Sequence, residues 1–406
     1  MKSHRHNWLD RLRERFKWHV WPVIHRLAWP VVWLRRRLRP HKISMRRLEG
    51  GIAGSEHPLT MLFAAKEHKA YLQELVFPKV TRETDLGVAR LMDVFRPEYG
   101  RGKNAGMVIL ETNQSLHQWL DDGSWFFIPA WVVGEVRLPL PEKTLRSDTI
   151  RTIRRKIRKY GFEYEAVGTT EQFKDYYYNM HVPYITKIYG PAACVQSYEE
   201  MQTRCEAAGF DLILLRKKDR PDVFVSGCLI IYEAHGPRLW SFGVRDGNVE
   251  LVQEGVLSAL YLFCFEHLLK KGFAQVNMGG NRPFLRDGVL AIKKRISQTL
   301  LLGRWEGFAL KVLELTPATK SFLVNNPFIF LANGRLHGAV FTTAPLTVTM
   351  VGELADEHFY PGLGKLLLFF FERNVRFQMS DLPPELAARV EIRAAAEVVS
   401  GHLHLP

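Results

Sequence analysis

The loop GGNRPFLRDG, residues 279–288, carries polar side chains suited to substrate binding and catalysis in this 406-residue chain. Arg282 and Arg286 are suited to an anion, because a guanidinium makes paired hydrogen bonds to a carboxylate or a phosphate. Asp287 offers a catalytic base, although an Asp-Gly pair is also a common turn. Just upstream, Asn277 offers an amide that can orient a substrate. These residue types favour the binding of an anionic substrate.

A group of tyrosines forms a second set of candidates. Their hydroxyls could donate protons, and we assign Tyr184 to acceptor binding. Irregularly spaced tyrosines also serve simply as packing residues, so both interpretations stay open for the set Tyr176, Tyr177, Tyr178 and Tyr184.

The elements that position these residues are predicted from residue type and turn chemistry. Three segments rich in β-branched and aromatic residues are separated by the short turns KDRPD and HGP, which predicts antiparallel strands at 210–218, 223–234 and 238–244. A buried helix at 250–271 then leads to a strand at 273–278. A strand–helix–strand crossover makes its two strands parallel, so 238–244 and 273–278 should run parallel in a mixed sheet.

Upstream segments complete this unit. GFEYEAVG, residues 161–168, is a further strand, and two helices follow it, the second with Ser197 as its N-cap and Glu200 three residues on. The predicted order is therefore β, α, α, β, β, β, α, β, α.

This order, together with TIRTIRRKIRKYG, WSFGVRDGN, the helix around Glu254-Gly255-Val256, VNMGG and AIKKRIS, resembles the GNAT acyltransferase superfamily. Within it, the chain is similar to the FemAB-like and BioF2-like branch over residues 150–302. The resemblance implies a mixed α/β acyltransferase fold, with two tandem GNAT-like halves as an extension of that prediction. It also implies transfer of an acyl or aminoacyl group to an amine or hydroxyl.

The resemblance also implies site residues. The donor is expected between strand 238–244 and strand 273–278, and Asn277, Asp287 and Lys293 are the catalytic candidates, Lys293 by its match to the family's "YK" lysine. Arg282, Arg286 and Tyr184 are the acceptor-binding candidates. The donor-binding candidates are Ser241, Phe242, Gly243, Val244, Arg245, Gly247, Asn248 and Gly255.

One departure from the family concerns the donor. The usual pyrophosphate loop before the central helix, Arg/Gln-x-x-Gly-x-Gly/Ala, is absent, and RDGNVELVQEG stands in its place. Gly255 would let an anionic group approach the positive end of the helix, but Glu250 and Glu254 compete for that field. Acyl-CoA or acetyl-CoA is the expected co-substrate, aminoacyl-tRNA is the alternative, and no metal is expected.

Composition limits the other classes. The chain is 47% hydrophobic and contains four cysteines without metal-ligand spacing, Cys194, Cys205, Cys228 and Cys264. No apolar run reaches the ~20 residues of a membrane-spanning helix, so we predict a cytoplasmic protein. The motifs of Ser hydrolases, P-loop NTPases and HExxH metalloproteases are absent. His402 and His404 have no acidic or Cys neighbours and are expected in a frayed terminus.

The positive charge is concentrated in the basic aromatic segment 1–50. It has 14 Lys and Arg against 3 Asp and Glu, a net +11 of the chain's +14, and five of the ten tryptophans. An amphipathic helix at 7–21 ending before Pro22 would suit an anionic membrane surface. The alternatives are a solvated tail, a helix packed on the protein, or nucleic-acid contact. Nucleic-acid contact other than tRNA as a donor carrier is not expected, because it should also leave basic stripes on the nearly neutral body.

Two further segments flank the predicted acyltransferase domain at 150–302. Residues 51–149 are expected to form a partial GNAT-like half that ends at LPLPEK. Residues 303–406 are expected to form an α/β extension of unknown role, with a strand in AVFTTAPLTVTMV, a helix near KLLLFFFERN and a final helix through PPELAARVEIRAAAEVV.

Two functions therefore remain open from the sequence. The first is a GNAT-like N-acyltransferase with a small-molecule acyl donor and an amine or hydroxyl acceptor. The second is a catalytically silent GNAT-like scaffold that docks at the membrane periphery through segment 1–50.

Overall fold

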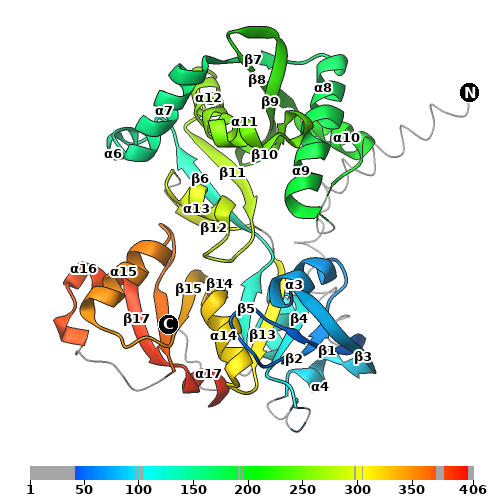
Figure 1. Cartoon of the computed structure of the whole chain (residues 1–406), viewed down its shortest axis with the longest axis vertical. Helices are drawn as coiled ribbons and strands as arrows, with labels where there is room; N and C mark the ends of the chain where they lie inside the picture. The colour runs from blue at the N-terminus through cyan, green and yellow to red at the C-terminus, as the bar shows by residue number, and fades with distance from the viewer. Residues whose placement is uncertain are drawn as a thin grey trace, which may run out of the picture. The chain divides into compact units, whose positions relative to one another are not determined.

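The computed structural model describes residues 42–400 except 97, 98, 101, 103, 122, 191, 192, 194, 297, 298, 304 and 372–378. The predicted amphipathic helix at 7–21, Cys194, His402 and His404 lie outside the described residues. The described chain is a mixed α/β protein with two compact units (Figure 1). Unit 1 comprises Glu135–Gly279, and unit 2 combines residues 42–134 with residues 280–400.

Unit 1 contains most of a seven-stranded sheet with the order β12-β6-β11-β10-β9-β8-β7. The elements, in chain order, are β6 (Val132–Arg137), α6 (Glu142–Leu145), α7 (Asp148–Tyr160), β7 (Phe162–Val167), α8 (Thr170–Tyr176), the π-helix η2 (Tyr177–His181), α9 (Val182–Tyr189), α10 (Tyr198–Ala208), β8 (Phe210–Lys217), β9 (Arg220–Glu233), β10 (Gly236–Val244), the 3-10 turn η4 (Arg245–Gly247), α11 (Val249–Glu254), α12 (Val256–Lys270) and β11 (Gln275–Asn281).

The predicted order of elements is confirmed from β7 to β11, whereas the final helix of that order, Gly288–Lys294, belongs to unit 2. β8, β9 and β10 are antiparallel neighbours, and β10 and β11 are parallel. The predicted helix 250–271 is divided into α11 and α12 at Gly255, whose φ of 99° is left-handed and therefore favours glycine. The capping box is also present, since the Ser197 side chain accepts from the Glu200 amide and the Glu200 side chain from the Ser197 amide.

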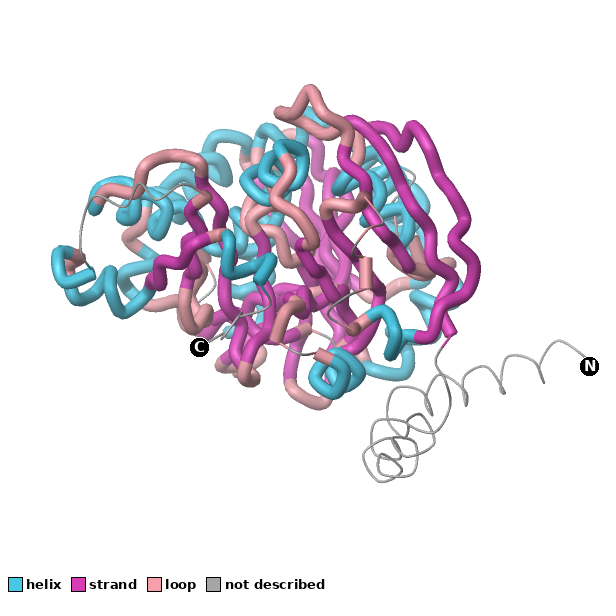
Figure 2. The backbone as a smooth tube through the Cα atoms, turned by 90° about the horizontal axis from the view of Figure 1, so that it is seen from below, coloured by secondary structure: helices cyan, strands magenta, loops and turns pink. Residues whose placement is uncertain are grey.

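Helices cover both faces of this sheet. Leu212, Leu214, Leu229 and Ile231 pack in one apolar cluster with residues of α8, η2 and α10. α12 contacts β8, β9 and β10 and buries seven of its side chains, which explains why its sequence is apolar on most faces. Figure 2 shows strands gathered into sheets with helices alongside them.

Unit 2 contains a ten-stranded sheet with the order β17-β16-β15-β14-β5-β13-β4-β2-β1-β3. Its elements are β1 (Lys42–Gly51), β2 (Leu59–Ala64), α3 (Lys69–Val76), β3 (Lys79–Arg90), α4 (Leu91–Val94), β4 (Met107–Asn113), α5 (Gln114–Leu120), β5 (Phe126–Pro129), α13 (Gly288–Lys294), β12 (Thr299–Leu302), β13 (Glu306–Val312), α14 (Pro317–Asn325), β14 (Phe328–Ala332), β15 (Arg335–Thr342), α15 (Val348–His358), β16 (Leu366–Phe370), η5 (Met379–Asp381), α16 (Pro384–Arg389), β17 (Val390–Ala394) and α17 (Ala396–Ser400).

The domain boundaries differ from those predicted. Residues 42–51 form β1, which pairs with β2 and β3, so the folded chain begins inside the predicted segment 1–50. The predicted units 51–149 and 303–406 contribute strands to one sheet, because β13 pairs with both β4 and β5. Strands far apart in sequence thus make one unit, which local sequence patterns do not reveal.

Three element predictions near the C-terminus are corrected. Residues 366–370, expected as a helix, form β16, an apolar run buried between two parallel neighbours. The expected final helix is interrupted by β17. The strand expected through residue 351 ends at Thr342, and α15 begins after Thr347, whose side chain caps it by accepting from the Met350 amide.

One topological pattern occurs in both units. In unit 1, the antiparallel strands β9 and β10 are followed by a helical connection and by β11, parallel to β10. In unit 2, the antiparallel strands β14 and β15 are followed by α15 and by β16, parallel to β15. A second copy of the pattern therefore lies at 328–370, and the GNAT-like half expected at 51–149 stays a prediction.

Within the described residues, no helix is both long and apolar enough to cross a membrane. Of the four cysteines, the three described ones, Cys205, Cys228 and Cys264, are buried free thiols.

Candidate functional site

The two copies of the pattern differ in how their parallel strands pair. In unit 2, β15 and β16 are in register over five residues, 338–342 against 366–370. In unit 1, β10 and β11 are described in full and are in register at one position, Arg238 opposite Asn277. On its other edge, β10 pairs with β9 as far as Val244. We call the opening between β10 and β11 beyond Arg238 the splay.

The splay matters because backbone groups inside a sheet need partners. Past Arg238, the β11-facing edge of β10 is not in register with a neighbouring strand, so backbone groups on that edge can bind an extended ligand, apart from the Phe242 carbonyl, which contacts His181. The predicted donor-binding residues Ser241, Phe242, Gly243 and Val244 all lie on this part of β10.

We call residues 241–245, at the end of β10, the donor wall. Its successive β10 side chains point to opposite faces of the sheet. The Phe242 ring lies 4.8 Å, between centroids, from the ring of Tyr261 on α12. Ser241 lies on the other face, where its Oγ is 2.6 Å from the Tyr176 hydroxyl of α8. Val244 is fully buried. The side chains of the donor wall therefore pack into the unit, and its backbone is what β10 can offer to a ligand.

Ser241 belongs to a buried polar group with Tyr176 and His181. Its Oγ is 3.0 Å from His181 Nδ1, which also lies 3.0 Å from the carbonyl oxygen of Phe242. Tyr176 is completely buried, and burial raises the pKa of its phenol well above the ordinary value. Burial lowers the pKa of His181, although the bond to Phe242 opposes that shift. The sequence analysis named Tyr176 but missed His181.

The backbone of η2 lies directly against β10. A Cβ atom at Gly243 would be 2.7 Å from the backbone nitrogen of His181 and 2.8 Å from the Met180 carbonyl carbon. Glycine is thus required here for close approach, and the contact places His181 beside the donor wall. Single-turn π-helices of this kind occur often at functional sites.

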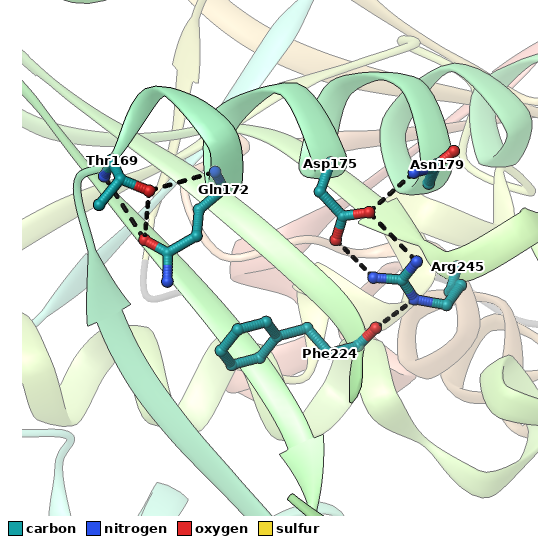
Figure 3. Close-up of polar contacts among 6 residues, drawn as sticks. All are labelled: Thr169, Gln172, Asp175, Asn179, Phe224 and Arg245. Atoms are coloured by element: carbon teal, nitrogen blue, oxygen red, sulfur yellow. Dashed lines mark hydrogen bonds and ion pairs between the residues drawn. The ribbon is translucent and has the colours of Figure 1, made fainter. Parts of the chain in front are cut away.

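Arg245, predicted to bind the donor, contacts α8 and β9 (Figure 3). Its guanidinium donates to both oxygens of Asp175 on α8, Nη1 at 3.2 Å and Nη2 at 2.5 Å, and its Nε donates to the Phe224 carbonyl. Asp175 also accepts from Asn179 at 2.7 Å. Burial raises the pKa of Asp175, but these hydrogen bonds outweigh it and hold that pKa below its ordinary value. Arg245 therefore fastens α8 to the end of β10.

The remaining donor-binding candidates shape the turn that leads into α12. Gly247 has a φ of 58°, and a Cβ there would be 2.9 Å from the Pro183 carbonyl oxygen. Asn248 caps α11 by accepting from the Glu250 amide at 2.8 Å. Both residues thus have local structural roles.

Gly255 begins α12 and lies beside a cation that the sequence analysis did not single out. The Lys156 side chain packs at Gly255, and its Nζ donates to the Gln253 carbonyl at 2.8 Å. Glu254, expected to compete with a phosphate, is paired with Lys217 at 2.7 Å. Both features favour an anion at the start of α12 more than the sequence suggested.

The other candidates in unit 1 are Asn277 and Tyr184. Asn277 Oδ1 accepts from the Gly279 amide at 2.8 Å, so half of its amide is used in a local turn. Tyr184 lies partly buried on α9.

The structure assigns Arg282, Arg286, Asp287 and Lys293 to unit 2, whereas the donor wall belongs to unit 1. The Arg282 guanidinium lies 3.7 Å from the Tyr71 ring centroid and 4.1 Å from that of Trp131. Asp287 caps α13 by accepting from the Leu290 amide at 2.8 Å, which is the turn alternative.

Arg286 and Lys293 differ in their exposure to solvent. Arg286 is exposed, and its Nη1 donates to the Asn325 carbonyl at 3.4 Å. Lys293 is buried on α13. Their predicted substrate roles remain predictions.

One group in unit 2 has the composition of a metal site. Glu67, His68 and Glu111 each offer a ligand atom, and these atoms lie within 4.8 Å of one another. Burial and the nearby Arg282 guanidinium lower the pKa of His68. A neutral imidazole suits a metal, but a neighbouring guanidinium opposes a cation, so we assign no metal here.

No family model matches the chain, and no curated protein matches it. Among solved structures, it is similar to L-PGS from Bacillus licheniformis, with 12% identity over 65% of this chain and 83% of that chain and a TM-score of 0.32. FemX gives 11% identity, 66% and 84% coverage, and a TM-score of 0.34. A GCN5-related N-acetyltransferase from Sphaerobacter thermophilus has 12% identity over 63% of this chain and 73% of that chain, with a TM-score of 0.31. Such distant similarities do not identify a substrate or a reaction.

Proposed function

We propose that unit 1 is a GNAT-like acyltransferase whose activated donor binds in the splay between β10 and β11. The observation that carries this proposal is the single register position between the two strands, Arg238 opposite Asn277. The matching strands β15 and β16 of unit 2 are closed over five residues, so the opening is not a general consequence of the topology.

The chemistry of acyl transfer fits this opening. An extended acyl donor with amide groups can pair with strand backbone as an added strand would. Backbone N–H groups of β10 are held rigidly by the β9 ladder, and such preoriented donors stabilise an oxyanion that develops on the attacked carbonyl. The start of α12, with Lys156 beside it, can receive an anionic part of the donor.

The donor class is the finer part of the proposal. A thioester of coenzyme A and an aminoacyl ester of tRNA both present an acyl carbon next to an extended, anionic carrier. The acceptor is an amine or a hydroxyl.

A thermal-shift screen of the full chain tests this proposal. Acetyl-CoA, longer acyl-CoAs, free CoA and charged tRNA are each added, and product is sought by mass spectrometry with a panel of amines. A donor that binds only the folded state adds about 2.7 kcal/mol of stability at 100 times its Kd. A raised melting temperature with the acylated product supports the proposal. A chain that binds none of these donors contradicts it.

A further inference from the structure

His181 is a histidine that contacts two residues of the donor wall. Its Nδ1 lies 3.0 Å from Ser241 Oγ and 3.0 Å from the Phe242 carbonyl oxygen, and both residues belong to β10. The position is fixed on a second side, because the η2 backbone lies against Gly243 with no room for a Cβ atom. The backbone that carries the imidazole is therefore held against β10.

The hydrogen bonds of His181 determine its tautomer. A carbonyl oxygen can only accept, so the contact with Phe242 requires the proton on Nδ1. Ser241 Oγ can accept from the same N–H, whereas a lone pair on Nδ1 would face the carbonyl oxygen at 3.0 Å with no proton between them. The neutral ring therefore carries its lone pair on Nε2. Among the described residues, Nε2 has no hydrogen-bond partner, and it is not one of the buried unpartnered atoms.

From this geometry we propose that His181 is the general base of the acyltransferase, receiving the proton of the attacking acceptor at Nε2. The inference rests on the proposed function and adds the residue that activates the acceptor. Ser241 and Tyr176 are positioning residues, since they hold the Nδ1 side of the ring and do not reach the substrate through it.

The step balances as follows. The acceptor nitrogen or oxygen forms a bond to the acyl carbon, and its proton passes to Nε2. The bond from the acyl carbon to the donor's sulfur or oxygen then breaks, and its electron pair leaves with that atom. The leaving atom takes the proton from Nε2, which returns His181 to the neutral state. While the ring is charged, the Phe242 carbonyl and Ser241 Oγ accept from Nδ1–H and stabilise it.

The neighbouring phenols and the Asp175 carboxylate do not change charge over the pH range in which His181 titrates. The phenols of Tyr176 and Tyr177 have raised pKa values, so both remain neutral at neutral and acid pH. Asp175, paired with Arg245, has a lowered pKa and remains charged until well below pH 6. α9 contributes Lys187, whose side chain packs at Gly247. The pKa of His181 itself is lowered from 6.5 by burial, which keeps the ring neutral at pH 7.

The test measures kcat/KM against pH for the full chain and for H181A and H181Q, with the donor found by the thermal-shift screen. H235Q is the matched control, because His235 is exposed in the turn between β9 and β10. Loss of a general base costs about 10²- to 10⁴-fold in rate. We expect this loss for both His181 variants with donor affinity unchanged, wild-type rates for H235Q, and partial rescue of H181A by added imidazole.

The acid limb of the wild-type profile should lie below pH 6.5, and S241A and Y176F should shift it while leaving a folded protein. A second readout is independent of activity: ¹⁵N NMR should show His181 protonated at Nδ1 and unprotonated at Nε2. The proposal is overturned if His181 variants keep wild-type turnover, or if the neutral ring carries its proton on Nε2. A wild-type chain that binds no donor overturns the proposed function as well, which distinguishes the two failures.

Discussion

Arg245 gives a sharp test of the site's architecture, because the sequence and the structure assign it different roles. The sequence places it on the donor wall, whereas the structure pairs it with Asp175 and the Phe224 carbonyl (Figure 3). A donor-binding arginine should be replaceable without loss of stability. An arginine that fastens α8 to β10 should not.

The size of the effect follows from burial. The Arg245 and Asp175 side chains are 23% and 33% exposed, so the pair is less screened than a surface pair worth ~0–1 kcal/mol. R245A also removes the hydrogen bond from Arg245 Nε to the Phe224 carbonyl. Asp175 then keeps the hydrogen bond that it accepts from Asn179. Hydrogen bonds to charged groups contribute about 1.5–3 kcal/mol each before this screening. We expect R245A to lower stability by about 2–3 kcal/mol in total.

The assay is a double-mutant cycle of R245A and D175A, followed by thermal melting and by hydrogen exchange of residues 170–181. The single change should lower the melting temperature by about 4–12 °C, since 1 kcal/mol corresponds to about 2–4 °C in a domain of this size. The coupling energy should be about 1–2 kcal/mol. R216A is the control, because Arg216 pairs with two more exposed carboxylates, Glu163 and Glu165, which are 48% and 46% exposed. If R245A behaves like R216A, with no coupling to Asp175, the structural role is refuted and the donor-binding role regains support.

Two further predictions concern packing and pH. G243A should destabilise unit 1 by at least ~1–3 kcal/mol in urea melts and reduce turnover, because its Cβ would meet backbone atoms of η2, whereas G168A, with open space around it, should be tolerated. Burial lowers the pKa of His117 and of His358 to about 4, against 6.5 when unfolded. The unfolded chain therefore binds more protons between these values, so their contribution, up to about 3 kcal/mol each, is full above pH 6.5 and is lost as pH falls toward 4. Urea melts from pH 7.5 to 4.5 should show the free energy of unfolding falling with pH, and H117Q and H358Q should each make this dependence weaker. A dependence equal to that of the wild-type chain in both variants would contradict the assignment.

Much of unit 1 was predictable from the sequence because its signals are local. Short turns between β-branched segments indicate antiparallel strands, and a long apolar helix between strands indicates a parallel crossover. The capping box at Ser197 marks a helix start with little ambiguity. These rules gave the order of elements and the parallel pairing of β10 with β11.

Unit 2 was less predictable because its determinants are not local. The buried run at 366–370 has no periodicity that separates a strand from a helix, and its neighbours in the sheet come from residues 338–342 and 390–394. The sheet that joins residues 42–134 to residues 306–394 depends on pairings across hundreds of positions.

The site residues divide in the same way. Ser241 was found from its position on β10, but His181 was not, because a histidine in YYYNMHV gives no sign that a π-helix will carry it to Gly243. Arg245 and Asp287 were expected to contact substrates, yet they bond Asp175 and cap α13 respectively. A polar residue type indicates what a side chain can do, and only the fold determines which partner it meets.

The central claim is that the donor binds along the open edge of β10, and hydrogen–deuterium exchange tests it most directly. Exchange of the full chain is measured with and without the donor identified by thermal shift, and the closed pair β15 and β16 serves as the internal control. We predict that the donor slows exchange at residues 239–244 of β10 and leaves residues 338–342 of β15 unchanged. Protection at β15 or elsewhere, with no change at 239–244, would contradict the claim.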